Sequence, residues 1–223
     1  MPEPKTLVDV AYATLRAKII EGSLGPGTKL RVEHLREQLG IGATPLREAL
    51  SRLTAERLVR SEGQRGFRVA PMSLAELDDL SENRALLESR AMELSVKNGD
   101  VAWEARVVAA HHTVNHADKQ LAKGKIDVLE RERQNAAFHD ALISACGSPW
   151  LLELRATLYD QLSRYRALSI KEGSARDLGN EHDLIVEAAL ARQAKKAAQL
   201  LGEHVRATAI ALRPVIGEHL GAA

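Results

Sequence analysis

The stretch from residue 35 to residue 69 limits the possible folds more than any other part of this sequence. Its centre places apolar residues at the i, i+3, i+4 and i+7 spacing of one helix face: Leu46, Ala49, Leu50 and Leu53. Such a helix has one buried side, and Arg47 falls on the other side. Thr44 precedes Pro45. Because a hydroxyl can cap free N–H groups and proline fits a first turn, the helix is predicted to begin there.

A second helix is predicted just upstream, over Val32 to Leu39, with residues 40–42 as the turn between the two. Two short helices around a Gly-containing turn form a helix-turn-helix, whose second helix can enter the major groove of DNA. Downstream, residues 58–61 and 67–69 are predicted as two short strands joined by a Gly-rich tip that carries a cation. The pattern as a whole predicts a winged helix-turn-helix.

At these residues the sequence resembles the GntR family of bacterial transcription regulators. The matching segments occur in the family's order and at its spacing: residues 26–30, 39–40, 44–50, 58–59 and 63–66. The resemblance implies binding to double-stranded operator DNA, and it nominates the following contacts: Arg31, Thr44, Arg47, Arg52, Gln64, Arg65 and Gly66. Arg47 is the cation expected to reach DNA from the second helix. For Arg31, Arg52, Gln64 and Arg65, a phosphate contact and an ordinary surface position look alike in sequence.

The chain departs from the family pattern at one point. Where the family usually reads Ser-Arg before Thr-Pro, this sequence has Gly42-Ala43. In the family the serine is a helix cap and the arginine usually contacts DNA, so both roles must move or be lost here. This difference affects the operator sequence more than the DNA-binding class.

Charge and composition fit this picture. The net charge of +1 is unevenly divided, because residues 1–71 hold twelve Lys and Arg against eight Asp and Glu, and the remainder holds nineteen against twenty-two. A modest positive charge on the helix-turn-helix supports nucleic-acid binding without proving it. The single cysteine, Cys146, excludes an intrachain disulfide and is expected in the core. No signal-peptide layout or long apolar run is found, which predicts a soluble cytoplasmic protein of bacterial type with no membrane partner.

After a short linker at residues 70–72, strand-like alternation stops. Breakers divide the rest into six predicted helices, over residues 74–97, 101–122, 126–146, 150–169, 175–192 and 195–212, the last closed by Pro214. The expected domains are a winged helix-turn-helix over residues 1–71 and an effector-binding and dimerisation domain over residues 72–223. The fold class is therefore mainly α, with the winged domain followed by an all-helical antiparallel bundle, a fold that holds ligands between inward-facing side chains.

Four residues of the second domain could bind a metal ion. Asn135 and His139 are four apart and share one helix face, and His182 and His204 lie on two later helices. An oxygen and three imidazoles would suit a divalent ion such as Zn, Ni or Mn if they converged. Spacing alone favours the alternative that these are scattered surface histidines.

The second domain also resembles a known family. Phe138-His139, Glu181-His182 with Ile185, Glu203-His204-Val205 and the segment around Arg84 are similar to the FCD effector domain of the FadR subfamily. Six helices are similar to its VanR-type branch. The resemblance implies a metal site formed by Asn135, His139, His182 and His204, with a small carboxylate effector completing the shell. Asn135 stands where the family usually has Asp, so metal affinity is expected to be lower.

Arg84 is the candidate for the effector's anionic end, because its planar guanidinium matches a carboxylate. The alternative is an intrahelical ion pair with Glu88, four residues further on. Both interpretations stay open at this point.

The expected function is that of a ligand-responsive transcription regulator, a homodimeric repressor released from its operator by the effector. The alternative is a helical metalloenzyme using His139, His182 and His204 with an open coordination position. Glu181 is the only carboxylate nearby for a general base, and its other interpretation is a charge favoured by a helix N-terminus. We therefore expect a regulator and not an enzyme.

Overall fold

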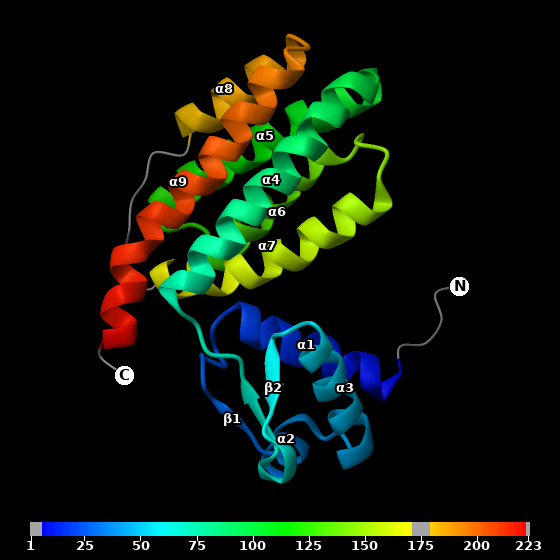
Figure 1. The fold of residues 1–223 in the computed structure, drawn as a ribbon, viewed down its shortest axis with the longest axis vertical. Helices are drawn as coiled ribbons and strands as arrows, with labels where there is room; N and C mark the ends of the chain where they lie inside the picture. Colours follow the sequence, from blue (N-terminus) through cyan, green and yellow to red (C-terminus); the bar gives the residue numbers. More distant parts are fainter. Residues whose placement is uncertain (1–5, 171–178, 222–223) are drawn as a thin grey trace. The chain divides into compact units, whose positions relative to one another are not determined.

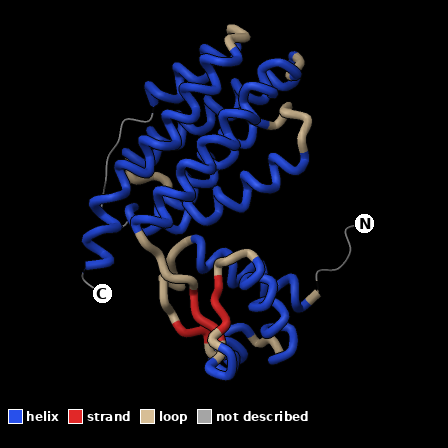
Figure 2. The backbone as a smooth tube through the Cα atoms, in the orientation of Figure 1, coloured by secondary structure: helices blue, strands red, loops and turns tan. Residues whose placement is uncertain are grey.

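The computed structural model describes residues 6–170 and 179–221, and it divides into two compact units (Figure 1). The winged-helix unit extends up to Ser73 and includes Asp160–Leu168. The bundle unit contains Leu74–Tyr159 and the C-terminal segment from Ser169. All three strands belong to the winged-helix unit, and the described part of the bundle unit is helices joined by loops (Figure 2).

Three helices form the frame of the winged-helix unit: α1 (Leu7–Ile20), α2 (Val32–Leu39) and α3 (Ala43–Ala55). Helix α1 begins at a capping box, in which the Thr6 hydroxyl accepts from the Asp9 N–H and the Asp9 carboxylate accepts from the Thr6 N–H. The four apolar residues predicted to face inward from α3 are fully buried: Leu46, Ala49, Leu50 and Leu53. They pack against α1 and the sheet in one apolar core, which confirms the helix-turn-helix pattern.

The sheet has three antiparallel strands in the order β1-β3-β2: β1 (Lys29–Leu30), β2 (Val59–Ser61) and β3 (Phe67–Val69). Strands β2 and β3 form the predicted hairpin, with Arg60 opposite Arg68 and a short 3-10 turn, Gly63–Arg65, at its tip. Strand β1 was not predicted, because two residues are too few to show alternation. It pairs Leu30 with Phe67.

The start of α3 differs from the prediction. Its N-cap is Gly42, which makes no side-chain cap bond, and Thr44 lies inside the first turn. The reason is that Gly40 ends α2 in the left-handed conformation, with φ 66°. The turn between the helices is therefore complete at Gly42, two residues before Thr44. Pro45 still falls in the first turn, where the missing N–H breaks no helical hydrogen bond.

The bundle unit is built from α4 (Leu74–Asn98), α5 (Val101–Ala122), α6 (Val128–Ile143), the first part of α7 (Pro149–Ile170), α8 (Gly179–Leu190) and α9 (Ala194–Gly221). These helices agree with the predicted ones to within a few residues, apart from the ends of the last two. Residues 175–178 of the fifth predicted helix lie outside the described residues. Trp103, Phe138 and Val107 are among the fully buried core residues.

Helix α9 does not end before Pro214, as the sequence predicted, but continues to Gly221 with the proline inside it. Proline removes one hydrogen bond to the carbonyl four residues earlier, that of Ile210. Ile210 and Pro214 are both on the exposed side of α9, whereas Leu212 and Ile216 are buried. The apolar inner face therefore continues through the proline, and water can reach the side on which the bond is missing.

Helices α4 and α9 lie side by side (Figure 1) and approach closely where α9 carries Gly202. A Cβ atom at Gly202 would lie 2.5 Å from Ser89 Oγ. That hydroxyl donates to the Ala198 carbonyl at 2.9 Å. Only a residue without a side chain fits here without movement of Ser89.

Helix α7 contributes to both units. Its C-terminal half bonds to the winged-helix backbone, because Gln161 Nε2 donates to the Glu56 carbonyl at 2.7 Å and Arg164 donates to the Ala70 carbonyl. The Tyr165 hydroxyl also lies 3.2 Å from both the N–H and the carbonyl oxygen of Ser73. The predicted domain boundary after residue 71 stays a prediction, because the winged-helix unit contains residues 160–168 as well as the N-terminal segment.

None of the helices in the described ranges is both long enough and apolar enough to cross a bilayer.

Candidate metal centre and nucleic-acid interface

Three histidines from three helices meet inside the bundle unit: His139 from α6, His182 from α8 and His204 from α9. Each offers one ring nitrogen, and these atoms lie within 4.8 Å of one another. All three side chains are buried, with relative exposures of 1%, 0% and 5%. The alternative that they are scattered on the surface is therefore wrong.

The cluster contains ligand atoms that no other described group satisfies. Within the described residues, Asn135 Oδ1, His139 Nε2 and both ring nitrogens of His182 have no hydrogen-bond partner. Asn135 is itself buried and lies one turn before His139 on α6. Buried polar atoms without partners are unfavourable, and a metal ion could bind Asn135 Oδ1, His139 Nε2 and one of the two ring nitrogens of His182. The residues present thus fit a divalent ion.

The protonation of the histidines also fits metal binding. Burial lowers the pKa of His139 to about 3, although the Glu88 carboxylate opposes this shift. Burial lowers the pKa of His182 far below its usual range, and the neighbouring His204 and His139 add to the shift. Both rings are therefore neutral near pH 7, which is the form that binds metals.

Two carboxylates contact the outer sides of the histidine rings. Nδ1 of His139 lies 2.8 Å from Glu88 Oε2, and Nδ1 of His204 lies 2.8 Å from Glu181 Oε2. Glu181 comes directly before His182 in sequence, but its carboxylate reaches a histidine of another helix. Sequence alone could treat it only as a charge near a helix start.

Glu88 is fully buried and bonds two arginines as well as His139. Its Oε1 accepts from Arg84 Nε at 2.8 Å and from Arg155 Nε at 2.6 Å. Burial by itself would raise the pKa of Glu88, but the two guanidinium groups outweigh burial and hold the pKa well below its usual range. The intrahelical pair expected between Arg84 and Glu88 is thus present, and binding of an effector by Arg84 stays a prediction.

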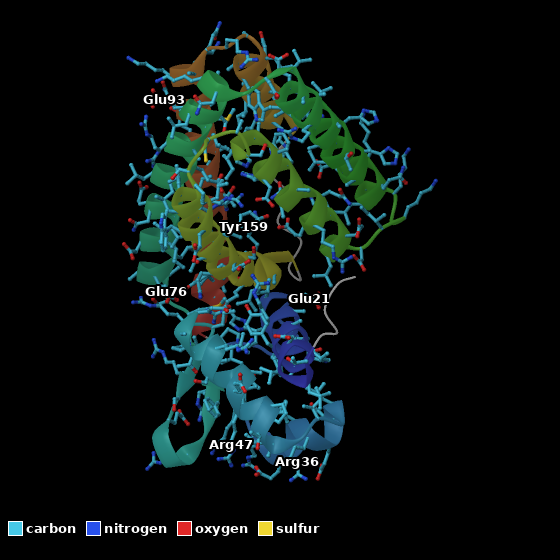
Figure 3. All side chains as sticks on the ribbon, turned by 90° about the vertical axis from the view of Figure 1, so that its right-hand side faces the viewer. Glu21, Arg36, Arg47, Glu76, Glu93 and Tyr159 are labelled. Carbon is cyan, nitrogen blue, oxygen red and sulfur yellow. The ribbon has the colours of Figure 1, made fainter. Side chains whose placement is uncertain are left out.

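Sequence reasoning missed Arg155 and Tyr159, which α7 brings to the same cluster. The guanidinium carbons of Arg84 and Arg155 each lie 4.5 Å from the centre of the Tyr159 ring, as cation–π contacts. Figure 3 shows Tyr159 among the side chains of the bundle. The only sequence signal was the i, i+4 spacing of Arg155 and Tyr159, which is common on any helix.

The candidate DNA contacts lie on the winged-helix unit. Thr44 and Arg47 are exposed on α3, Arg31 is exposed where α2 begins, and Arg65 is exposed at the tip of the wing. Gly66 follows Arg65 with a left-handed φ of 94° and is half-buried. The side chain of Gln64 lies outside the described part. Arg36, which the sequence pattern did not single out, lies at the same end of this unit as Arg47 (Figure 3).

Arg52 differs from the other candidates because it has partners within its own unit. Its guanidinium donates to Asp9 of α1 at 3.1 Å and to Glu48 of α3 at 3.0 Å. Its role in DNA binding stays a prediction.

A winged helix-turn-helix followed by a helical bundle with a buried histidine cluster defines a class of protein, the bacterial regulators that read DNA with one domain and sense a ligand with the other. Comparison with known families agrees. Residues 7–69 match the family described as bacterial regulatory proteins, gntR family, and residues 79–207 match the FCD domain. The chain belongs to the GntR family of transcriptional regulators and carries the FCD effector-binding domain.

Relatives support the same assignment. The chain is 38% identical to the uncharacterized HTH-type transcriptional regulator BphR of Paraburkholderia xenovorans, over 94% of this chain and 86% of that protein. It is 36% identical to the HTH-type transcriptional repressor GlaR of Escherichia coli, over 87% of this chain and 90% of that protein. The structure of E. coli McbR has the same fold, with a TM-score of 0.79 at 23% identity, and the match covers 95% of this chain and 99% of that one. These relatives are transcriptional regulators and not enzymes.

Proposed function

We propose that this regulator is a homodimeric repressor that leaves its operator when a small carboxylate effector binds at or near a metal ion in the bundle unit. The observation that carries the proposal is the buried histidine cluster, with its unsatisfied ligand atoms on His139, His182 and Asn135. GlaR, a relative along most of the chain, is named a repressor. As a regulator of bacterial operons, the protein would act in the cytoplasm.

The metal ligands in this proposal are Asn135, His139, His182 and His204. Imidazole and amide ligands suit zinc, nickel or manganese. The metal would polarise a bound carboxylate and hold it in place. These four ligands carry no negative charge, so an anionic ligand would be attracted to the ion.

Arg84 supports the assignment of a carboxylate effector. Its guanidinium is buried, and Nη2 lies 3.3 Å from His139 Nδ1, beside the proposed metal site. Arg155 bonds the same carboxylate, Glu88, and also pairs with Asp140. A planar guanidinium at this position could bind the planar carboxylate of an effector with two parallel hydrogen bonds.

DNA binding is tested by fluorescence anisotropy with duplex DNA from upstream of the gene, over a series of salt concentrations. We expect saturable binding that is tighter than to random DNA and weakens as salt rises. Arg47→Ala should lose about 1–3 kcal/mol of binding free energy. Arg106→Ala, which removes an exposed cation from α5, is the matched control and should bind like the wild type. Equal affinity for random DNA would contradict specific recognition by α3.

The same assay tests the effector. The zinc-loaded protein bound to DNA is titrated with small mono- and dicarboxylates, and release by one of them at low concentration is expected. A protein stripped with a chelator should unfold at a lower temperature and regain its stability with zinc, since binding to the native state stabilises it. No change in melting temperature on chelation and readdition of zinc, nickel or manganese would argue against a metal site.

A further inference from the structure

Nδ1 of His139 has two neighbours with opposite hydrogen-bonding demands. Glu88 Oε2 lies 2.8 Å from it and can only accept, whereas Arg84 Nη2 lies 3.3 Å from it and can only donate. The proton on this nitrogen decides which neighbour is satisfied. It also decides whether Nε2 carries a lone pair, because a neutral imidazole holds a single ring proton.

The structure indicates which neighbour prevails. The carboxylate contact is shorter by half an ångström and lies well within hydrogen-bonding range. A lone pair on Nδ1 would face a buried, ionised carboxylate, which is unfavourable in a site with little water. The proton therefore lies on Nδ1 and donates to Glu88, and the lone pair lies on Nε2.

Nε2 of His139 is also the ring nitrogen without a partner among the described residues. The His139 side chain is buried, and it forms the cluster with His182 and His204. We propose that Glu88 is the positioning residue that fixes the His139 ring, so that its Nε2 lone pair faces the metal site. This inference rests on the metal site of the proposed function.

The arginines define how Glu88 does this. Both guanidinium groups bond Oε1, which leaves Oε2 to His139 alone among the contacts described here. The carboxylate is thereby held in one orientation by α4 and α7, and it orients a ligand carried by α6. Arg84 would bind Nδ1 instead if the carboxylate were missing, and the ring would then carry its proton on Nε2, where it blocks metal binding.

The test compares Glu88→Gln with the wild type in two measurements. In the metal-free protein, long-range ¹H–¹⁵N NMR reports which ring nitrogen of His139 carries the proton. We expect Nδ1–H in the wild type and a shift toward Nε2–H in the variant, because a glutamine amide can donate as well as accept. Competition with a chromophoric chelator should show zinc affinity reduced about 10- to 100-fold.

Glu93→Gln is the matched control, because it makes the same change on α4 away from the histidines. Glu93 pairs instead with Arg90 and Lys97, and it lies at the edge of the bundle in Figure 3. In the Glu93→Gln variant, the His139 tautomer and the zinc affinity should match those of the wild type. If Glu88→Gln fails to fold, Glu88→Asp keeps the charge beside the arginines but draws the carboxylate back from Nδ1, and it should also weaken zinc binding.

The outcomes separate this inference from the proposed function. Nε2–H in the wild type, or unchanged tautomer and affinity in a folded Glu88 variant, would overturn the role of Glu88. A wild type with Nδ1–H that binds no zinc, nickel or manganese would support the ring orientation and contradict the metal site.

Discussion

Asn135 lies one turn before His139 on α6, and in the proposed site it supplies a neutral oxygen beside the imidazoles. Its side chain is buried, and its Oδ1 has no partner among the described residues. A carboxylate there would strengthen metal binding, but in the absence of metal it would be a buried charge among uncharged rings. The amide thus favours the metal-free protein at the expense of affinity, which would let the effector contribute more of the binding.

This reasoning predicts opposite effects of Asn135→Asp on the two forms of the protein. Zinc affinity should rise, on the order of tenfold, because an anionic oxygen replaces a neutral one. The metal-free variant should melt at a lower temperature than the metal-free wild type, and the zinc-loaded variant at a higher one. Calorimetry with and without chelator measures both, and Gln38→Glu, at an exposed position of α2 next to His34, controls for the added charge. A variant with unchanged zinc affinity would show that position 135 is not a ligand.

Residue types identified the histidines of the site but not their surroundings. The i, i+4 spacing placed Asn135 and His139 on one face, yet convergence with His182 and His204 depends on how three helices pack. The sequence offered Glu88 only as a possible intrahelical partner of Arg84 and gave no sign that it is buried. Its burial follows from Arg155, which comes from a helix 67 residues further along the chain.

At the scale of helices and strands, the sequence predicted each helix from α2 to α9 as a helix, because glycines and prolines mark most of the loops. It failed where neighbouring structure decides the outcome. Helix α9 continues through Pro214 because its buried face continues, and β1 exists because β3 offers it a partner. Thr44 does not cap α3, since Gly40 ends the preceding helix first.

The contact between α4 and α9 provides a test at this scale. Gly202→Ala should lower the free energy of unfolding by about 1–3 kcal/mol through overpacking against Ser89. Alanine is the better helix former, and this offsets about 1 kcal/mol of that loss. Ser89→Ala removes the Oγ atom that the new methyl group would meet.

A double-mutant cycle by chemical denaturation therefore measures this single contact. The two substitutions together should cost less than the sum of their separate effects. Strict additivity would show that the helices do not approach closely at Gly202.

For the whole molecule, the buried histidines predict how stability depends on pH. The unfolded chain takes up protons on His139 and His182 near their ordinary pKa of 6.5, whereas the folded protein holds both rings neutral to much lower pH. Stability contributed by these groups is therefore complete above about pH 6.5 and is lost as pH falls toward 3. In this range, each histidine lowers the free energy of unfolding by up to about 1.4 kcal/mol for every unit that the pH falls.

The metal-free protein should accordingly melt at a lower temperature at pH 5 than at pH 7. Replacing both histidines by glutamine should flatten this dependence, whereas His219→Gln, at an exposed position of α9, should leave it unchanged. An equal slope in the double variant would mean that other groups govern acid sensitivity.

Helix α7 makes the structural boundary between the two units differ from the boundary between the two matched families. The winged-helix unit is completed by the C-terminal half of α7, a later segment of the chain, through Gln161, Arg164 and Tyr165. A transplant of the first 73 residues onto another regulator would leave Glu56, Ala70 and Ser73 without these partners. If the DNA-binding domains of two relatives are exchanged, the C-terminal half of α7 must therefore be exchanged as well. Otherwise the α7 of the recipient must already carry side chains that make the same hydrogen bonds.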